Sequence, residues 1–172
     1  INPVTPFAQN APIIFCDETK HCAFVDPGGD IDVLLNIAKE NNLVPKMILL
    51  THGHCDHAGG ASELARILSL PIIGPHKKDD FLLSSLNEQG QMFGMVAENC
   101  EPSKWLEEND IVDLGNSTLR VLFCPGHTPG HIVFFNAESK LALVGDVIFK
   151  DSVGRTDPVS YTHLTLPTTT IV

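Results

Sequence analysis

Short apolar segments in the first half of the chain predict strands. Residues 11–16 and 22–25 are joined by a polar stretch at 17–20, which is typical of two strands and a turn. Residues 47–50 are wholly apolar and predict a strand that is buried on both faces. Residues 71–74 predict one further short strand.

Helices are expected between these strands. Asp30 is placed to cap a helix that begins at Ile31, carries apolar residues along one face and ends near residues 41–42. Residues 62–70 and 77–86 also predict helices, whereas 87–102 reads as a loop.

The second half of the chain changes to strand-like segments that are separated by glycine, asparagine and proline turns, at 110–114, 118–123, 131–135 and 141–144. Strands mixed with helices indicate a layered α+β or α/β domain. We expect this domain to cover residues 1–157. Residues 158–172 are rich in threonine and carry no charge, so we interpret them as a probable non-native tail.

Composition narrows the classes of function. The formal net charge of −10 disfavours nucleic acid as a partner, and no apolar stretch approaches the roughly 20 residues that span a bilayer, so no membrane is expected. The five cysteines are scattered and predict no disulfide framework, which favours a reducing, cytoplasmic location. Cys55 stands inside a histidine run, where a metal-ligand role has to be weighed.

That histidine run follows the buried strand at 47–50. His52, His54, Asp56 and His57 lie within six residues. In an extended stretch the side chains of residues 52, 54 and 56 point the same way, while His57 points elsewhere and can serve a second ion. Imidazole and carboxylate ligands suit Zn²⁺, Mn²⁺ or Fe²⁺. The alternative is a polar loop that is rich in histidine by chance.

Two later segments place one further side chain each just beyond a strand. His127 follows the strand that ends at Phe123, and Asp146 follows residues 141–144. Sites in open α/β sheets gather at such strand ends. His127 alone would be an ordinary core or surface histidine, but its place in Gly-His-Thr-Pro-Gly-His favours a metal ligand. Asp146 is either a turn residue or, as we favour, a carboxylate that bridges two cations.

These segments together resemble a known family. Residues 51–57, 126–131 and 145–146 look like the metallo-β-lactamase-fold hydrolases, and more narrowly the small glyoxalase II-like (YcbL-type) branch. Further segments match at 25–29, in the helix from residue 61, and at 71–75, 92–94 and 154–157. The resemblance covers roughly residues 1 to 157. It implies an αββα sandwich that has its metals at one edge of two packed sheets and is incomplete at the C-terminal end.

The resemblance also implies a ligand set. His52, His54 and His127 would hold one divalent metal ion, Asp56 and His57 a second, and Asp146 would bridge both. Zinc is expected, with iron or manganese as alternatives. The family adds a late histidine to its second site, but this sequence has only His163, within the unusual tail. The second ion is therefore expected to bind weakly.

The leading hypothesis is a glyoxalase II-like hydrolase that converts S-lactoylglutathione, a small-molecule thioester, to D-lactate and glutathione. Metal ions would activate water for attack on the carbonyl, and Asp56 would orient the nucleophile and accept its proton. Arg155 is expected either to bind a substrate carboxylate or to form a surface ion pair. Asp26 would fix a ligand imidazole or cap a turn, and His131 is expected to be structural.

Two alternatives to this hydrolase stay open. One is a mononuclear-iron persulfide dioxygenase, which would use two of the histidines and Asp146. The other is an inactive, truncated metal-binding remnant. A β-lactamase is disfavoured, since those enzymes place a cysteine or no protein ligand where Asp146 stands.

Overall fold

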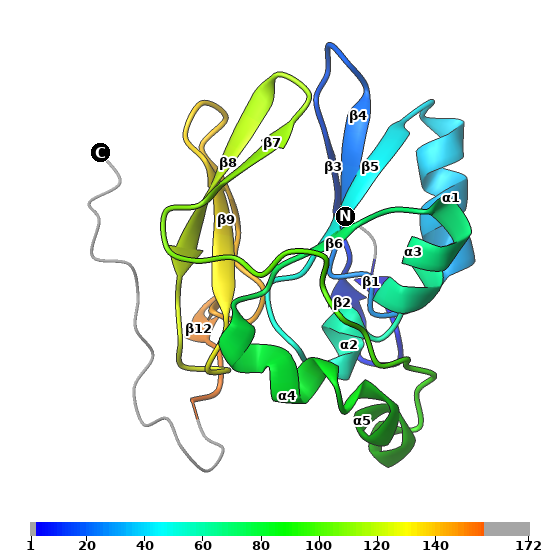
Figure 1. Cartoon of the computed structure of the whole chain (residues 1–172), viewed down its shortest axis with the longest axis vertical. Coiled ribbons are helices and arrows are strands. Elements are labelled where there is room, and N and C mark those ends of the chain that lie inside the picture. Colours follow the sequence, from blue (N-terminus) through cyan, green and yellow to red (C-terminus); the bar gives the residue numbers. More distant parts are fainter. Residues whose placement is uncertain (1–2, 157–172) are drawn as a thin grey trace.

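Two β-sheets packed face to face form the centre of the computed structural model, which describes residues 3–156 (Figure 1). The first sheet has the order β3-β4-β5-β6, comprising Ile13–Phe15, His21–Val25, Val44–Leu49 and Ile72–Ile73. The second has the order β10-β9-β8-β7, comprising Leu141–Leu143, Ile132–Asn136, Ser117–Phe123 and Ile111–Leu114. All eight strands coincide with or overlap segments that the hydrophobic pattern predicted.

Helices cover the outer face of the first sheet. Strands β4, β5 and β6 run parallel, which requires crossover connections, and α1 (Ile31–Glu40) and α3 (Ala61–Leu68) provide them. Figure 1 shows both helices on the same side of this sheet. The second sheet is antiparallel throughout, as expected for strands that are joined by short turns.

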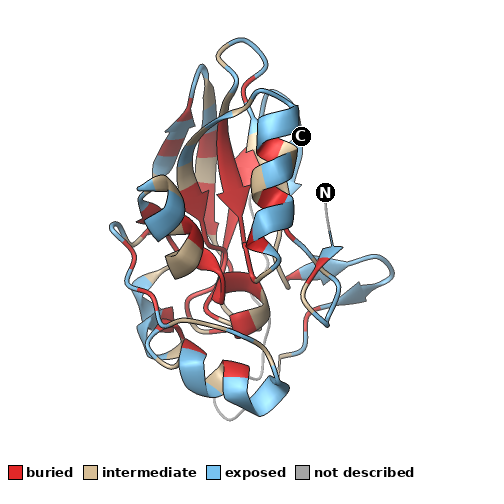
Figure 2. Ribbon diagram, turned by 90° about the vertical axis from the view of Figure 1, so that its right-hand side faces the viewer, coloured by how far each residue is buried: buried red, intermediate tan, exposed pale blue. Residues whose placement is uncertain are grey.

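The alternation of side chains along β4 and β5 divides the core into two layers. Phe24 and Ile48 face the helices, whereas Val25 and Leu49 face the second sheet. Figure 2 shows this buried centre and the exposed outer sides of the helices. Because the carboxyl ends of β4 and β5 are buried on both faces, packing fixes their positions, and the site described below lies just beyond them.

The second sheet has an apolar cluster of its own on the face that points away from the first sheet. Its members are Leu122, Cys124, Val133, Phe135, Val144 and Val147. No helix within residues 3–156 contributes to this cluster. The described part of the chain therefore shows both sheets of the expected αββα sandwich and the helical layer over one of them.

The helical region differs from the expectation in two places. Residues 77–83 are helical as predicted, but as a 3-10 turn, η1 (Lys77–Asp79), followed by α4 (Asp80–Leu83). The helix does not continue through residues 84–85, where the hydroxyl of Ser85 donates to the carbonyls of Phe81 and Leu82. The region read as a loop contains α5 (Leu86–Phe93). That helix buries few residues, so it has little hydrophobic periodicity.

The cap predicted for α1 is only partly right. Asp30 does precede the helix, but its side chain makes no capping hydrogen bond. Its carboxylate instead accepts from the backbone N–H of Thr5, at 2.8 Å, and so ties the N-terminal segment to the start of α1.

Three short elements were not predicted, because their sequences show no pattern of alternating apolar and polar residues. They are the hairpin β1 and β2 (Pro3–Val4 and Gln9–Asn10), the one-turn helix α2 (Cys55–Ala58), and the hairpin β11 and β12 (Ile148–Phe149 and Ser152–Val153). The predicted tail at 158–172 lies outside the described residues, so the boundary at residue 157 stays a prediction.

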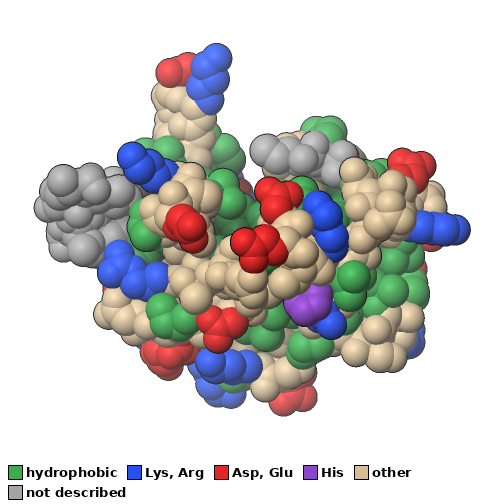
Figure 3. Space-filling view, turned by 90° about the horizontal axis from the view of Figure 1, so that it is seen from above, with side chains coloured by type: hydrophobic (Ala, Val, Ile, Leu, Met, Phe, Trp, Pro, Cys, Tyr) green, Lys and Arg blue, Asp and Glu red, His purple; other side chains and the backbone are tan. Residues whose placement is uncertain are grey.

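The surface carries charges of both signs. On the face in Figure 3, acidic and basic side chains stand beside one another and form no continuous basic area. Among residues 3–156, no helix combines the length and apolarity that are needed to cross a bilayer.

Candidate metal centre

The histidine run begins where β5 ends. Thr51 and His52 are fully buried beyond Leu49, and His54 has an extended backbone directly before α2 starts at Cys55. Asp56 therefore lies in the first turn of a helix rather than in an extended strand. The expectation that alternation aligns residues 52, 54 and 56 was wrong for Asp56, because the helix sets its direction.

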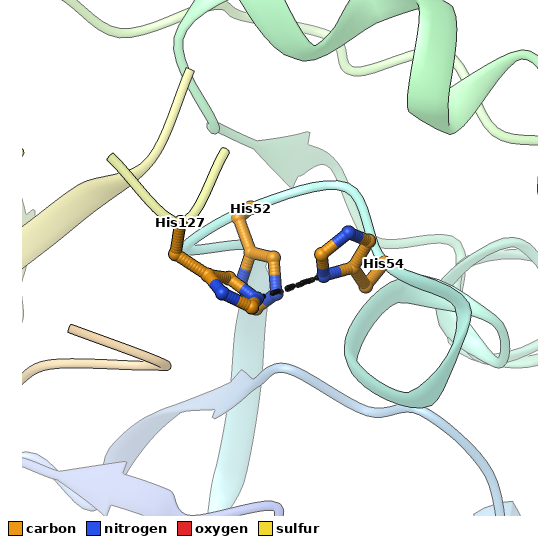
Figure 4. A group of neighbouring side chains, drawn as sticks. All are labelled: His52, His54 and His127. Atoms are coloured by element: carbon orange, nitrogen blue, oxygen red, sulfur yellow. Dashed lines mark hydrogen bonds between the residues drawn. The ribbon is translucent and has the colours of Figure 1, made fainter. Parts of the chain in front are cut away.

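Three imidazoles converge at this point (Figure 4). His54 Nδ1 lies 3.1 Å from His52 Nε2 and 3.0 Å from His127 Nε2. Nitrogens bound to one tetrahedral zinc ion at 2.0–2.1 Å would lie about 3.3 Å apart. The three donors therefore fit a single divalent cation with little movement.

Contacts to the Nδ1 atoms of His52 and His127 determine which ring nitrogens face the shared space between the three imidazoles. Thr51 Oγ1 lies 3.1 Å from His52 Nδ1, and the carbonyl oxygen of Arg155 lies 3.0 Å from His127 Nδ1. Such contacts fix ring orientation and tautomer in metal sites. They leave the Nε2 atoms of both residues directed toward His54.

Burial keeps two of these rings neutral. It lowers the pKa of His54 to about 3, with further lowering by His127 and His57, and it lowers the pKa of His52 well below its usual value. Metal ions bind neutral imidazole, so the site is already in the protonation state that binding requires.

Asp146 lies between these three histidines and a second group. Its Oδ2 is 3.3 Å from His127 Nε2, and its Oδ1 is 3.1 Å from His57 Nε2. Asp56 Oδ2 lies 3.7 Å from the same nitrogen of His57. One carboxylate thus contacts both groups, with one oxygen directed to each.

Asp26 holds His57 from the opposite side. Its Oδ2 lies 3.1 Å from His57 Nδ1, and its two oxygens also accept from the Thr51 N–H and hydroxyl at 2.7 and 2.6 Å. Ligand atoms of Asp26, His52 and His57 lie within 4.8 Å of one another, so distance alone would allow an ion there. The carboxylate already accepts three hydrogen bonds, which favours the positioning role.

The second group differs electrostatically from the first. Burial alone would lower the pKa of His57, but hydrogen bonds to Asp146 and Asp26 raise it above its ordinary value. Burial also acts to raise the pKa of Asp146, and the contact with His57 outweighs this and lowers it. Protonated His57 therefore supplies the positive charge beside the two carboxylates. A second cation bound there would supply that charge in its place.

His131 supports Asp146 without facing the centre. It is fully buried, its ring stacks on His52 with centroids 4.7 Å apart, and its Nε2 accepts from the backbone N–H of Asp146 at 3.1 Å. Burial lowers its pKa to about 3, so it stays neutral.

Asp79 connects the two ligand-bearing loops and was not anticipated. Its carboxylate accepts from Gly53 N–H at 3.0 Å, the Thr128 hydroxyl at 2.7 Å and Gly130 N–H at 2.5 Å. A Cβ atom at Gly130 would stand 2.7 Å from Asp79 Oδ1, so glycine permits this approach. Burial raises the pKa of Asp79 to about 6 although these bonds oppose the shift. No motif in the sequence marks it.

Two other sequence candidates have different surroundings. The buried side chain of Cys55 packs in the apolar core under the helices rather than with the histidines, and the structure contains all five cysteines as free thiols. Arg155 is exposed and lines a cavity of about 450 Å³ together with His54, His127 and Asp146. It therefore lies where it could meet a substrate.

The chain matches known proteins along most of its length. Residues 4–171 match the family model of the metallo-β-lactamase superfamily. The chain is 44% identical over 159 residues to hydroxyacylglutathione hydrolase GloC of Haemophilus influenzae, covering 91% of this chain and 74% of that protein.

Two solved structures are similar in fold and sequence. BLEG-1, a B3 metallo-beta-lactamase, has a TM-score of 0.81 and 32% identity, over 91% of this chain and 75% of its own. TTHA1623 in a di-iron-bound form has a TM-score of 0.80 and 32% identity, over 90% of this chain and 75% of its own.

Proposed function

The chain belongs to the metallo-β-lactamase superfamily, and from that premise we propose that it is a hydrolase that cleaves S-lactoylglutathione to D-lactate and glutathione. The relative named hydroxyacylglutathione hydrolase supports this substrate class, since it is 44% identical to the chain. Water is consumed, the bond between the carbonyl carbon and sulfur breaks, and an acid and a thiol leave.

The position of Asp146 is the observation that carries the proposal. Its two carboxylate oxygens contact His127 and His57, 3.3 and 3.1 Å away, in two separate groups of candidate ligands. We propose His52, His54 and His127 as one metal site, Asp56 and His57 as the other, and Asp146 as the shared ligand. The site binds divalent metal; zinc is our choice of ion, and the di-iron form of TTHA1623 keeps iron as the alternative.

Divalent cations in such a site lower the pKa of water and polarise a carbonyl oxygen. The chain supplies the rest. Asp56 points from α2 toward the same space and is partly accessible, so it can orient the attacking water and accept its proton. Burial raises the pKa of Asp56, which makes its carboxylate a stronger base. Asp26 and His131 hold His57 and Asp146 in place.

A β-lactamase activity is the second candidate. The presence of Asp146 disfavours it, but the B3 metallo-beta-lactamase BLEG-1 has a similar fold and 32% identity to the chain. The persulfide dioxygenase stays a weaker alternative. It needs one iron ion, and it leaves Asp56 and His57 without a role although both lie beside Asp146.

One set of assays separates these activities. Metal-loaded protein is given S-lactoylglutathione, a chromogenic cephalosporin, or glutathione persulfide with oxygen uptake recorded, and bound metal is measured by mass spectrometry. We expect turnover of the thioester alone. Cleavage of the cephalosporin in its place would favour the β-lactamase, and oxygen uptake with one iron per chain would favour the dioxygenase.

A further inference from the structure

Three phenylalanines stand beside the metal centre without a role in it. Phe7 lies between β1 and β2, Phe93 ends α5 and Phe149 ends β11. All three line the same 450 Å³ cavity as His54, His127 and Asp146. Segments that are far apart in the sequence therefore supply one aromatic wall.

These rings remain open to solvent. The exposed fractions are 53% for Phe7, 53% for Phe93 and 46% for Phe149. The rings of Phe7 and Phe93 meet edge to face, with centroids 5.7 Å apart, so they pack against each other. Exposed aromatic groups that gather at a cavity are typical of a ligand-binding surface.

Polar groups line the cavity together with these rings. They include the candidate metal ligands and Arg155. Gln89 also lines it, but its side chain accepts from the Cys55 N–H and donates to the carbonyl of Leu82, so it serves the loop rather than a ligand. A molecule in this cavity would therefore meet both the metal centre and the phenylalanine rings.

We infer that the three phenylalanines form a subsite for a bulky apolar group of the thioester substrate, on either its acyl or its thiol side. This inference rests on the proposed thioester hydrolysis. A cavity of about 150 Å³ suffices for benzene in a protein interior. The 450 Å³ here therefore accommodates a phenyl ring together with the thioester itself. The lactoyl group, with a single methyl, would leave the subsite unfilled.

Substrates with matched changes test the subsite. We compare kcat/KM for S-lactoylglutathione, for S-mandeloylglutathione, in which phenyl replaces methyl on the acyl side, and for the lactoyl thioester of benzyl mercaptan, with phenyl on the thiol side. The zinc-loaded protein should favour one phenyl substrate over S-lactoylglutathione by about tenfold, the scale of a modest apolar contact. The favoured substrate identifies the side that the rings bind.

Alanine variants of the cavity phenylalanines test whether these rings cause the preference for the phenyl substrate. Phe93→Ala and Phe149→Ala should remove this preference while leaving S-lactoylglutathione turnover within about twofold. Phe81→Ala is the matched control, since Phe81 is 57% exposed on α4 and does not line the cavity. All three variants should have similar melting temperatures, because each ring is about half exposed.

Binding provides a readout that does not depend on catalysis. If the rings bind the acyl side, calorimetry of the metal-free protein should show at least fivefold tighter binding of S-benzylglutathione than of S-methylglutathione, and Phe93→Ala should abolish that difference. Equal kcat/KM for all three thioesters overturns the subsite, and equal binding of the two thioethers overturns a subsite on the acyl side, where their benzyl and methyl groups stand. Absence of thioester cleavage together with retained preference for the benzyl thioether supports the subsite and instead overturns the proposed reaction.

Discussion

Replacing Asp79 with asparagine should alter the pH dependence of stability. The native carboxylate is buried and accepts three hydrogen bonds from the loops that carry His52 and His127. Asparagine has nearly the same shape but does not ionise. The substitution therefore removes one ionisable group. It also replaces one carboxylate oxygen, which accepts a hydrogen bond, with an amide NH₂ that faces a buried backbone N–H.

The size of the effect follows from the pKa. Burial raises the pKa of Asp79 to about 6 in the folded chain, whereas an unfolded aspartate has a pKa of about 3.9. The folded state therefore holds this proton more tightly, and the stabilisation present at low pH is lost as the pH rises from about 4 through 6. A difference of about two pH units corresponds to about 3 kcal/mol.

The assay is urea unfolding of the metal-free protein between pH 4.5 and 7.5, followed by circular dichroism. Over this range wild type should lose about 2 of these 3 kcal/mol relative to Asp79→Asn, because the remainder is already lost below pH 4.5. Asp80→Asn is the matched control, since it makes the same chemical change one residue away on the surface. Parallel pH profiles for wild type and Asp79→Asn would refute the reasoning.

The same variant should weaken metal binding. Loss of groups that support a metal site typically costs 10- to 100-fold in affinity, and we expect the lower end because Asp79 contacts the loops rather than the imidazoles. Zinc titration with a competing chelator measures this change. An unchanged dissociation constant would show that Asp79 does not position the ligands.

Three further predictions concern the metal. His54→Ala or Asp146→Ala should remove most bound metal as measured by mass spectrometry, and unchanged metal content would refute the ligand assignment. Zinc at 100 times its dissociation constant should stabilise the chelator-treated protein by about 2.7 kcal/mol, seen as a higher melting temperature, and identical melting curves would contradict specific binding. Calorimetric titration should show that the second zinc ion binds at least about tenfold more weakly than the first. The reason is that the second group offers one imidazole, whereas the first offers three. Two zinc ions bound equally tightly would contradict this prediction.

The sequence predicted most of the strands and the gathering of the site residues. His52, His127 and Asp146 each lie just beyond the end of a strand, and the packed sheets bring those strand ends together. The predicted direction of the Asp56 side chain was wrong. A one-turn helix, whose sequence is too short to show a hydrophobic period, replaces the expected extended stretch.

Other parts of the site had no signal in the sequence. Asp79 lies 26 residues from Gly53 and 51 from Gly130, so its role depends on tertiary contacts alone. The aromatic wall is equally hidden, since Phe7, Phe93 and Phe149 come from two short hairpins and from a helix with few buried residues. Only the folded chain places them in one cavity.

Steady-state hydrolysis of S-lactoylglutathione by the zinc-loaded chain, its chelator-treated form and the zinc-treated Asp146→Ala variant tests the central claim most directly. The account predicts thioester cleavage by the zinc-loaded chain, loss of that cleavage on metal removal, and at least a hundredfold lower rate in the variant. Equal rates in all three samples would contradict a hydrolytic metal centre organised around Asp146.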